Sequence, residues 1–499
     1  MTALDPAAEV AVIGAGAMGT GIAQVAAQAG HRVHVFDTRM GAADAAQQQI
    51  AESLRKLAGK GKLDPSEAEA AAARIVPVHA LGDMVSARLV VEAIVEDLDA
   101  KRKMLRDLEV VVAADAVLAS NTSSFSITSL AAGMKHAQRI VGMHFFNPAP
   151  ILPLVEVVSG LATDADVAAM VYDTAKAWGK IPVHAKSTPG FIVNRCARPF
   201  YGEGLRIVQE NAADPATIDA VMREAGAFRM GPFELMDLIG LDVNFSVTKS
   251  IWEAYFHDPR YAPSAIQAEL VAGGRFGRKS GRGFYDYAAD ARKPTPATDG
   301  PRARPSSVTA VGAGPLVDGL RERMTAAGIA VERTAGSGPP HFVVDGAILA
   351  PSDGRAASAL GGDAVVYDLA FDYRACTRLA VAPSSACSDA AYEAAAGALQ
   401  AAGIAVSRMR DAPGLIVMRT VAMLANEAAD AVSQDVASAR DVDLAMRNGL
   451  NYPIGPLAWA DAIGVEHVRT VLGNLSAYYG DPRYRTSPLM RRRQALLDE

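Results

Sequence analysis

The stretch Glu9-Val10-Ala11-Val12-Ile13-Gly14-Ala15-Gly16-Ala17-Met18-Gly19 decides the fold of this 499-residue chain. Its first five residues are mostly apolar and predict a buried strand, and the pattern GxGxxG follows directly. A helix of small residues is expected from Ala17 to about Gln28, and residues 31–37 predict a second strand that ends at Asp37. Strand, glycine turn, helix and strand within about 30 residues indicate a dinucleotide-binding βαβ unit.

Each glycine of this turn has a physical reason to be there. Gly14 permits the tight turn, Gly16 lets backbone amides approach a pyrophosphate, and Gly19 lets the helix pack close to the strand. Asp37 can accept hydrogen bonds from an adenosine ribose and would repel a 2′-phosphate. The pattern therefore predicts NAD as the cofactor. A glycine-rich turn in an ordinary α/β domain is the alternative.

Strands and helices alternate beyond this turn. Two polar, alanine-rich helices are expected over residues 42–73, with a break near Gly59-Lys60-Gly61. After Pro189-Gly190 the pattern becomes helical to about Asp286. The alternation predicts an α/β fold of the Rossmann type, a doubly wound parallel sheet, followed by an all-α domain. Further buried strands are expected at residues 89–91, 116–119 and 139–143.

Composition excludes several classes of protein. Lys and Arg number 49 against 55 Asp and Glu, and the formal net charge of −6 argues against nucleic acid and acidic membrane surfaces as partners. The cysteines Cys196, Cys376 and Cys387 lack the spacing of a zinc site or a disulfide framework, so no metal is expected. We find no apolar run of roughly 18 residues and no signal-peptide pattern at the N-terminus. We therefore expect a cytoplasmic protein.

The second half of the chain repeats the first. Pro189-Gly190 matches Pro413-Gly414 and Gly231-Pro232 matches Gly455-Pro456, each pair 224 residues apart. Val311-Gly312-Ala313-Gly314 also resembles the first glycine turn. We predict an NAD-binding Rossmann domain with a helical insertion (1–187), a helical domain (188–290), a proline-rich linker (291–305), a reduced Rossmann-like domain (306–410) and a second helical domain (411–499).

The second copy has lost residues that the first copy needs. Val317 stands opposite Gly19, Ala335 opposite Asp37, and Met418 opposite Asn194. By eye, Val343-Val344-Asp345 matches Val90-Val91-Glu92, and the strand 378–382 ends at Pro383 where the first copy has His144. On this alignment the helices of residues 42–73 are deleted. We therefore expect the second copy to be a degenerate, catalytically silent version of the same plan.

His144 and Glu156 are candidates for proton transfer. His144 follows the predicted strand 139–143, so it is expected at the carboxyl end of a strand, where open α/β sheets bind ligands. Glu156 lies in the apolar run Leu154–Val158, where a carboxylate needs a partner. A histidine oriented by a carboxylate is a good general base. From spacing alone, a core histidine and an edge-strand glutamate are an equal alternative.

Two further positions are candidates for binding substrate. Ser120-Asn121-Thr122-Ser123-Ser124 follows a predicted strand, and its hydroxyls can bind a substrate oxygen, although capping the next helix is the commoner use. Asn194 follows the apolar residues Gly190–Val193, where a buried structural amide is the alternative.

Five blocks of sequence, taken in order, resemble the L-3-hydroxyacyl-CoA dehydrogenase family. The resemblance covers residues 8 to about 287 closely, and residues 411–499 resemble a second copy of the family's helical domain. The blocks are Ser120–Ser124, His144-Phe145-Phe146-Asn147-Pro148, Leu154-Val155-Glu156-Val157, Thr188-Pro189-Gly190-Phe191-Ile192-Val193-Asn194-Arg195 and Gly231-Pro232-Phe233-Glu234-Leu235.

The resemblance implies a role for each matching residue. His144 would take the proton of the 3-hydroxyl group, Glu156 would hold His144, and Ser123 and Asn194 would bind substrate oxygens. The acyl-CoA substrate would also contact Ser53 and Lys60. Contacts to the dinucleotide are implied for Gly14, Gly16, Ala17, Met18, Gly19, Asp37, Glu96, Lys101, Asn147 and Lys279.

The resemblance implies NAD-dependent oxidation of an L-3-hydroxyacyl-CoA, on a short-chain or dicarboxylic acyl group, in fatty-acid or phenylacetate breakdown. Hydroxyacid dehydrogenases similar to lambda-crystallin, which act on gulonate rather than a CoA thioester, are the main rival. The 3-hydroxyisobutyrate and 6-phosphogluconate dehydrogenases need a lysine four residues before the asparagine, where this chain has Gly190. A scaffold protein descended from an enzyme is a third hypothesis.

In single-repeat members of the family, the helical domains pair across a dimer interface. The resemblance therefore implies that residues 411–499 pack on residues 188–287 within one chain. A homodimer of such chains stays open.

Overall fold

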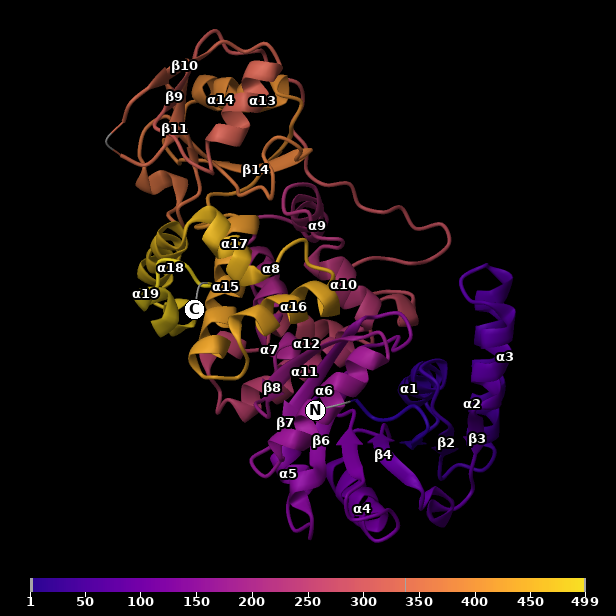
Figure 1. Cartoon of the computed structure of the whole chain (residues 1–499). Coiled ribbons are helices and arrows are strands. Elements are labelled where there is room, and N and C mark those ends of the chain that lie inside the picture. The colour runs from indigo at the N-terminus through magenta and orange to yellow at the C-terminus, as the bar shows by residue number, and fades with distance from the viewer. Residues whose placement is uncertain (1–2, 337, 498–499) are drawn as a thin grey trace. The chain divides into compact units, whose positions relative to one another are not determined.

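The computed structural model describes residues 3–336 and 338–497, and the chain forms two compact units (Figure 1). Unit 1 contains the residues up to Arg195 together with Gln434–Leu450. Unit 2 contains Cys196–Ser433 and the residues from Asn451 onward. The two units are described separately below.

Unit 1 is built on an eight-stranded sheet in the order β3-β2-β1-β4-β5-β6-β7-β8. Strands β1 to β6 are parallel, β7 is antiparallel to β6, and β8 is parallel to β7. The predicted Rossmann-type sheet is confirmed. The strands are β1 (Glu9–Ile13), β2 (Val33–Phe36), β3 (Ile75–Pro77), β4 (Ala87–Glu92), β5 (Val117–Ser120), β6 (Ile140–Phe145), β7 (Leu154–Ser159) and β8 (Ile181–Lys186).

Small side chains let helix α1 (Ala17–Gln28) lie close to the sheet, and nine of its residues are buried. A Cβ atom on Gly19 would lie 1.7 Å from the carbonyl oxygen of Gly14, so only glycine fits there. Gly14 has a φ of 104°, which L-residues with a side chain rarely adopt. The turn therefore needs these glycines for the reasons given by the sequence.

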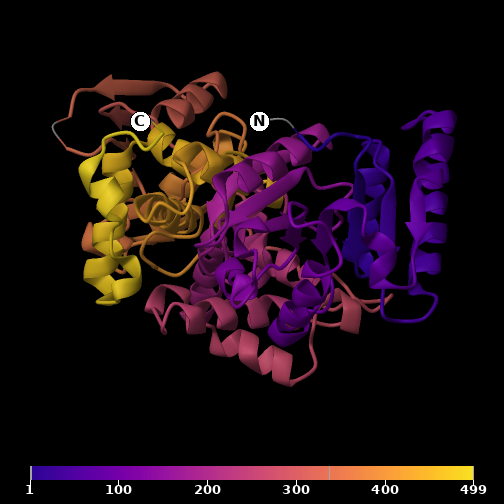
Figure 2. The same cartoon turned by 60° about the horizontal axis from the view of Figure 1, so that its bottom comes forward.

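The polar helices after β2 are present and break where expected. Helix α2 (Ala42–Gly59) and helix α3 (Pro65–Ala73) flank the break at Lys60–Asp64. Figure 2 shows α2, in indigo, along the edge of the first sheet that ends in β3. The remaining helices of the first segment are α4 (Leu98–Glu109), α5 (Ile127–Ala131), α6 (Ala165–Ala177) and the short α7 (Val193–Cys196), whose last residue belongs to unit 2.

A helix from the second half of the chain completes unit 1. Helix α16 (Ala439–Leu450) packs on β7 and β8. The amide of Lys186 donates to the carbonyl of Val436 at 2.8 Å, and the Lys186 ammonium pairs with Asp435. A Cβ atom on Gly449 would lie 2.7 Å from Cδ2 of Leu154, so the helix and the strand are in close contact. Residues about 250 positions apart in sequence thus share one core.

Unit 2 contains two sets of helices and a second sheet. The first set is α8 (Arg198–Gln209), α9 (Pro215–Glu224), α10 (Pro232–Ile239), α11 (Leu241–Ala254) and α12 (Ala265–Ala272). The second set is α15 (Val417–Ser433), α17 (Pro456–Ile463), α18 (Val465–Tyr479) and α19 (Pro488–Arg492). Two 3-10 turns, η3 (Pro259–Tyr261) and η6 (Pro482–Tyr484), occupy matching places in the two sets.

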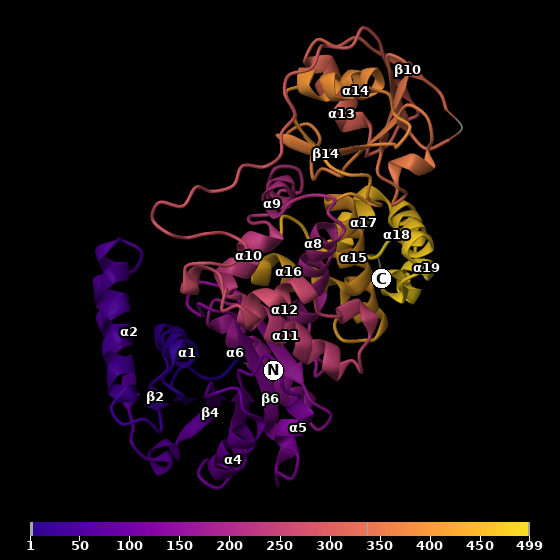
Figure 3. The same ribbon diagram turned by 180° about the vertical axis from the view of Figure 1, so that it is seen from behind.

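The two sets pair within the chain, as the resemblance implied. Helices α8 and α15 lie side by side (Figures 1 and 3). The turns η3 and η6 are also in contact. Arg419 on α15 is fully buried and donates to Glu203 on α8 at 2.6 Å. Arg260 in η3 pairs with Glu427 at 3.2 Å. Ion pairs of this kind, removed from water, tie the two sets into one core.

The second sheet has seven strands in the order β10-β9-β11-β12-β13-β14-β15. They are β9 (Val308–Val311), β10 (Val331–Thr334), β11 (His341–Val344), β12 (Ala347–Pro351), β13 (Ala364–Tyr367), β14 (Arg378–Pro383) and β15 (Ala405–Arg408). Helices α13 (Asp318–Ala326) and α14 (Asp389–Ala401) complete it. Among the described residues between β10 and β11 there is no helix, so this part of the second sheet shows no counterparts of α2 and α3.

One expected strand match is wrong. β11 contains Val343 and Val344 and is antiparallel to β9, whereas β4 is parallel to β1. β11 and β12 instead form a hairpin that turns at Asp345-Gly346, and Asp345 has a φ of 48°. The hairpin inserts an antiparallel strand that the first sheet does not have. Similar valine pairs in sequence do not carry strand direction, which is why the comparison by eye failed.

The expected counterpart of His144 is also wrong. β14 spans the residues 224 positions beyond β7, and α14 spans those 224 beyond α6. In the antiparallel pair β6–β7, His144 stands opposite Glu156, and in the pair β13–β14 the Asp368 amide donates to the Ala380 carbonyl at 3.0 Å. Asp368 therefore takes the place of His144, Ala380 that of Glu156, and Pro383 that of Ser159. The 224-residue offset extends further toward the N-terminus than the sequence comparison had traced it.

Among the described residues, none of the helices combines the length and the apolar character needed to cross a membrane.

Candidate active site

The glycine turn after β1 presents backbone amides to an incoming ligand. Gly16 caps helix α1 without any side-chain hydrogen bond, and a Cβ atom at Gly16 would meet nothing within 4 Å. The N-terminal amides of α1 therefore face open space, where the helix field favours an anion. Gly19, three residues further along the chain, lets the helix pack against the turn. These residues fit the pyrophosphate of a dinucleotide.

Asp37 lies one residue beyond β2 and beside the same turn. Its Oδ2 accepts a hydrogen bond from the Ala15 amide at 2.8 Å. Arg39 binds the carboxylate through Nε and Nη2, both at 3.0 Å. These hydrogen bonds, from Arg39 above all, lower the pKa of Asp37 to about 2 against the opposing effect of burial. The carboxylate is ionised at neutral pH and can accept from ribose hydroxyls.

His144 and Glu156 form a buried pair. His144 is the penultimate residue of β6, Glu156 lies opposite it on β7, and Nδ1 of His144 is 2.7 Å from Oε2 of Glu156. Glu156 is fully buried and His144 is 5% exposed. The strand register alone places the two side chains on the same face of the sheet. The twelve positions between His144 and Glu156 in the sequence thus span the connection between two antiparallel strands.

Glu156 is held from both sides. Its other oxygen, Oε1, accepts hydrogen bonds from the amides of Ile192 at 2.9 Å and Val193 at 3.0 Å. Gly190 and Phe191 have φ values of 76° and 47°, and this turn aims the two amides at the carboxylate. The carboxylate therefore cannot rotate away from His144. A fixed carboxylate on Nδ1 leaves Nε2 as the nitrogen that exchanges a proton.

The His144 ring is fixed by aromatic neighbours. Phe146 lies 4.5 Å and Phe191 5.9 Å from it, centroid to centroid. Within the described residues, Nε2 of His144 makes no hydrogen bond. The ring thus has one nitrogen bound to a carboxylate and one available to a substrate. This is the arrangement of a general acid–base group.

Glu96 organises the loop after β5. Its Oε1 accepts from the Thr122 hydroxyl at 2.6 Å, the Ser123 amide at 3.1 Å and the Ser124 hydroxyl at 2.7 Å. Burial tends to raise the pKa of Glu96, but the Lys101 charge and these hydrogen bonds lower it overall. Within the part of the chain that is described, the Ser123 hydroxyl makes no hydrogen bond. The loop therefore offers that hydroxyl to a ligand.

Lys101 is occupied inside the protein. Its ammonium is 1% exposed and lies 2.7 Å from Glu92 and 3.2 Å from Glu96. Glu92 is fully buried and also accepts from the Ser120 hydroxyl at 2.6 Å. In this structure Lys101 supports Glu96 and the loop after β5.

Two supporting residues were missed in the sequence. Glu92 anchors Lys101, and the Asn121 Oδ1 accepts from the Phe145 amide at 2.9 Å, which fixes the end of β6 next to His144. A carboxylate that ends an apolar strand, with a lysine nine residues later, was the available signal for Glu92. Asn121 had no signal beyond its position after β5.

The other predicted residues lie in varied settings. Asn194 directly follows Val193, whose amide binds Glu156. Asn147 is exposed three residues after His144. Ser53 is half-buried on α2, and Lys60 is exposed at its C-terminal end. Lys279 belongs to unit 2, where its ammonium pairs with Asp242 at 2.6 Å.

The second copy has no counterpart of this pair. Asp368, at the place of His144, is fully buried and accepts from the amides of Ile416, Val417 and Met418 at 2.7 to 3.0 Å. Ile416 and Val417 match Ile192 and Val193, which bind Glu156 in the first copy. One carboxylate in the second copy thus performs the anchoring and leaves no histidine for proton transfer.

Known families match nearly the whole chain. The NAD binding domain of 3-hydroxyacyl-CoA dehydrogenase matches residues 9–188. The C-terminal domain of the same enzymes matches twice, over residues 190–287 and 414–496. A reduced Rossmann-fold domain of 3-hydroxybutyryl-CoA dehydrogenase matches residues 349–413.

Similar proteins include single-copy and double-copy dehydrogenases. The chain is 41% identical to 3-hydroxyadipyl-CoA dehydrogenase of Escherichia coli over 98% of this chain and 97% of that one. A crystal structure of 3-hydroxybutyryl-CoA dehydrogenase from E. coli has a TM-score of 0.89, with 40% identity over 98% of both chains. That of (S)-3-hydroxybutyryl-CoA dehydrogenase from Ralstonia eutropha has a TM-score of 0.55 and 40% identity, and covers 56% of this chain and 99% of that one.

Proposed function

We propose that this chain, which belongs to the 3-hydroxyacyl-CoA dehydrogenase family, oxidises an L-3-hydroxyacyl-CoA to the 3-oxoacyl-CoA with NAD at the site of His144 and Glu156. The observation that carries the proposal is the buried pair, 2.7 Å apart, with Nε2 of His144 free of protein partners among the described residues. The glycine turn and Asp37 supply a dinucleotide site in the same unit.

The chain's own residues move one proton in this reaction. Nε2 of His144 takes the proton of the 3-hydroxyl group as the carbonyl forms, and gives it back in the reverse direction. Glu156 keeps the imidazole in the tautomer that leaves Nε2 unprotonated, and stabilises the imidazolium that results. NAD, when bound, supplies the acceptor for the hydride that leaves C3. Because Glu156 is locked by two amides, the ring stays aligned through the reaction.

The other residue roles are proposed from the family resemblance. The Ser123 hydroxyl and the Asn194 amide bind the substrate oxygens near His144. Ser53 and Lys60 on α2 contact the CoA moiety, where a cation at Lys60 favours a phosphate. Glu96 and Asn147 supply further dinucleotide contacts, and Lys101 acts on them through Glu96. A role for Lys279 is implied by the family resemblance alone. Asp37 favours NAD over a cofactor with a 2′-phosphate, although the neighbouring Arg39 offers that phosphate a cation.

The acyl group is short or dicarboxylic in this proposal. Support comes from the relatives, whose names specify 3-hydroxyadipyl-CoA and 3-hydroxybutyryl-CoA. Fatty-acid and aromatic-acid breakdown both produce such thioesters. The cytoplasm is the proposed compartment, in keeping with Cys196, Cys376 and Cys387, which form no disulfide among the described residues.

A steady-state scan tests the function. The full chain is assayed for NADH oxidation with acetoacetyl-CoA, longer 3-oxoacyl-CoA esters and a 3-oxo dicarboxylyl-CoA. Oxidation of gulonate with NAD is the comparison arm. We expect turnover with CoA thioesters and none with gulonate. Turnover with gulonate alone would establish the rival hydroxyacid activity. The absence of NADH turnover with every substrate would contradict the proposed dehydrogenase activity.

A further inference from the structure

The paired helix sets of unit 2 have an internal two-fold pattern. Helix α8 matches α15 at an offset of 224 residues, and the motif Asp258-Pro259-Arg260-Tyr261 recurs as Asp481-Pro482-Arg483-Tyr484. Arg260 and Tyr261 bind Glu427 of α15, and Tyr484 binds Glu203 of α8 at 2.9 Å. Glu203 and Glu427 are themselves matching positions. Two equivalent arginine sites therefore exist, one around Arg260 and one around Arg483.

The Arg260 site is filled and neutralised. Arg260 pairs with both Glu427 and Asp430. Asn426, one helix residue before Glu427, fills the space beside them: its Nδ2 donates to the Arg485 carbonyl at 2.9 Å, and its Oδ1 accepts from the Ser487 amide at 2.8 Å. The charge of the buried Arg260 is thus balanced by two carboxylates, and the amide side chain of Asn426 fills the space beside it.

The Arg483 site differs at the two positions that matter. Arg206 stands where the first site has Asp430, and Gly202 stands where it has Asn426. One carboxylate has become a second cation, and one amide side chain is missing. A Cβ atom on Gly202 would meet nothing within 4 Å, so the missing side chain leaves open space.

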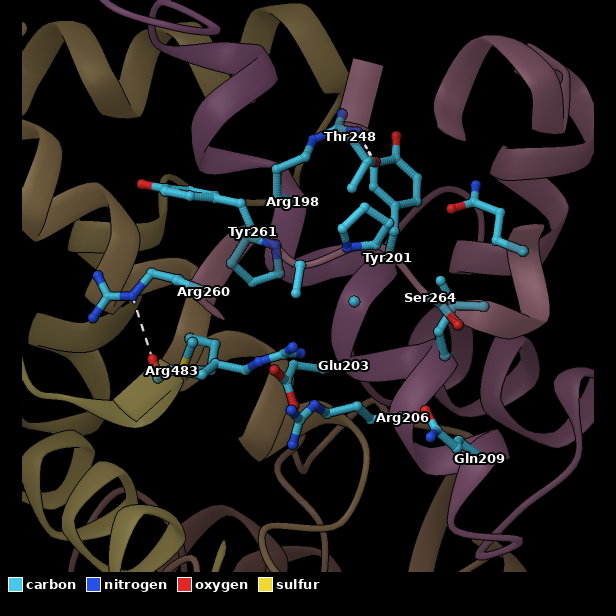
Figure 4. A pocket seen from close by; sticks show the side chains of 17 residues that line it. Arg198, Tyr201, Glu203, Arg206, Gln209, Thr248, Arg260, Tyr261, Ser264 and Arg483 are labelled. Carbon is cyan, nitrogen blue, oxygen red and sulfur yellow. Dashed lines mark hydrogen bonds between the residues drawn. The ribbon is translucent and has the colours of Figure 1, made fainter. Parts of the chain in front are cut away.

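A cavity of about 80 Å³ occupies that space, and Figure 4 shows the side chains around it. Its lining includes the side chains of Arg198, Arg206, Arg260, Ser264 and Arg483, the carboxylate of Glu203, and Gly202. One ordered water needs roughly 10–15 Å³ of such space, so the cavity has room for several waters or one small polyatomic ion.

Arg483 is poorly compensated in this cavity. It is 8% exposed, and within the described residues its guanidinium makes no hydrogen bond. Its closest carboxylate oxygen, Oδ2 of Asp481, is 4.0 Å from Nε and is taken by Arg206 at 2.6 Å. Burial and the Arg206 charge lower the pKa of Arg483, whereas Glu203 raises it. Glu203 is engaged by Arg419 at 2.6 Å and by Tyr484.

The Ser264 hydroxyl also lacks a partner and lies on the same cavity. Buried donors without partners cost free energy, and a bound anion would satisfy them. We infer that this cavity binds a small oxyanion such as inorganic phosphate, held by Arg483 together with Arg206, Arg198 and Ser264. The anion takes the place that the Asn426 and Asp430 side chains occupy in the matching site. It stabilises the pairing of the two helix sets.

Thermal unfolding of the full chain tests the site with inorganic phosphate as the probe, against chloride at matched ionic strength. Saturating NADH is present throughout, so that the glycine turn after β1 cannot report phosphate. In the wild type we expect a rise in Tm of about 2–4 °C that saturates in the millimolar range. Phosphate also stabilises proteins by exclusion from their surface, but that effect does not saturate.

Two variants remove the site. Gly202→Asn places in α8 the side chain that Asn426 has in α15, and Arg483→Gln removes the uncompensated cation. Both should lose the saturable rise, while Gly473→Asn, at an exposed glycine of helix α18, should keep it. A saturable rise of equal size in Gly202→Asn and Arg483→Gln would overturn the site, as would its absence in the wild type up to about 50 mM phosphate.

Discussion

Glu156 and Asp368 bind the backbone amides of matching segments, Ile192-Val193 and Ile416-Val417, but the two carboxylates stand at different places in their sheets. In the first copy the carboxylate stands on β7 and leaves the end of β6 to His144. In the second copy, Asp368 directly follows β13, the counterpart of β6, and Ala380 stands in the place of Glu156. The anchoring of the following helix persists in both copies. The group that moves a proton persists only in the first.

Glu156→Gln tests the positioning role of that carboxylate. The glutamine amide cannot accept both from the Ile192 and Val193 amides and from Nδ1–H of His144, so it favours the wrong imidazole tautomer. We expect kcat to fall by about ten- to a thousandfold, less than on loss of His144, with an altered pH profile of kcat and unchanged NADH affinity. A merely structural role would lower the stability and leave the pH profile unmoved.

Asp368→Asn tests the carboxylate of the second copy. Burial raises the pKa of Asp368 to about 6, against the opposing amide hydrogen bonds. Because the unfolded pKa is about 4, the folded state binds more protons between pH 4 and 6. The stability contribution of Asp368 is therefore full below pH 4 and falls by up to about 1.4 kcal/mol per pH unit until pH 6.

The measurement is denaturant unfolding of the wild type and Asp368→Asn from pH 4 to 8. The difference between their free energies of unfolding should change across pH 4 to 6 and level off above about 7. A difference that stays constant over the whole range would contradict the titration of Asp368. NADH turnover at neutral pH should survive wherever the variant is folded.

At the scale of elements, the sequence predicted what local chemistry determines. The turn of Gly14 and Gly19 and the break after Gly59 follow from short-range pattern, whereas the antiparallel direction of β7 was not predicted. The direction of β11 in the second sheet could not be predicted in this way, because this strand pairs through backbone hydrogen bonds that Val343 and Val344 allow in either direction. The seat of α16 on β7 and β8 was also out of reach, since its partners lie about 250 residues away.

The same limit applied to the site. His144 was predicted from its place after a strand and Glu156 from its place in an apolar run, and the structure shows that one strand pair brings them together. The support of the Ser123 loop by Glu96, Lys101 and Glu92 depends on side-chain hydrogen bonds across three elements, which spacing does not encode. Their assigned contacts to the cofactor stay predictions.

Gly449→Val tests the seat of α16. A Cβ atom at position 449 would lie 2.7 Å from Leu154 and 3.2 Å from Val193. Overpacking of this kind should destabilise unit 1 by about 1–3 kcal/mol, measured by denaturant unfolding followed through NADH binding. Gly473→Val, at an exposed helix glycine, is the control and should cost much less. Equal losses in both variants would show that α16 does not depend on this contact.

At the scale of the whole molecule, each helix set serves the other copy. Helix α16, from the second copy, packs on β7 and β8 of the first sheet, and α9, from the first copy, packs on β14 of the second sheet. The amide of Phe371 donates to the Ala225 carbonyl at 2.8 Å, and Arg378 pairs with Glu224 at 3.1 Å. The second copy is therefore a structural partner built into the chain.

Removal of residues 306–499 should expose both surfaces. Glu203 would lose Arg419 and Tyr484, and β7 and β8 would lose α16. We expect the fragment of residues 1–305 to aggregate or to dimerise, measured by light scattering and analytical ultracentrifugation, although it keeps every proposed catalytic residue. A monomeric fragment as stable as the full chain would contradict an obligate pairing.

The central claim is that the chain has one dehydrogenase centre, at His144, and that the second copy is silent. The most direct test is the kcat of His144→Gln with acetoacetyl-CoA and NADH, in protein shown by titration to bind one NADH per chain. The account predicts a loss of about 10²- to 10⁴-fold with NADH binding intact. Retention of about half the activity would reveal a second working centre, and full retention would remove His144 from the reaction.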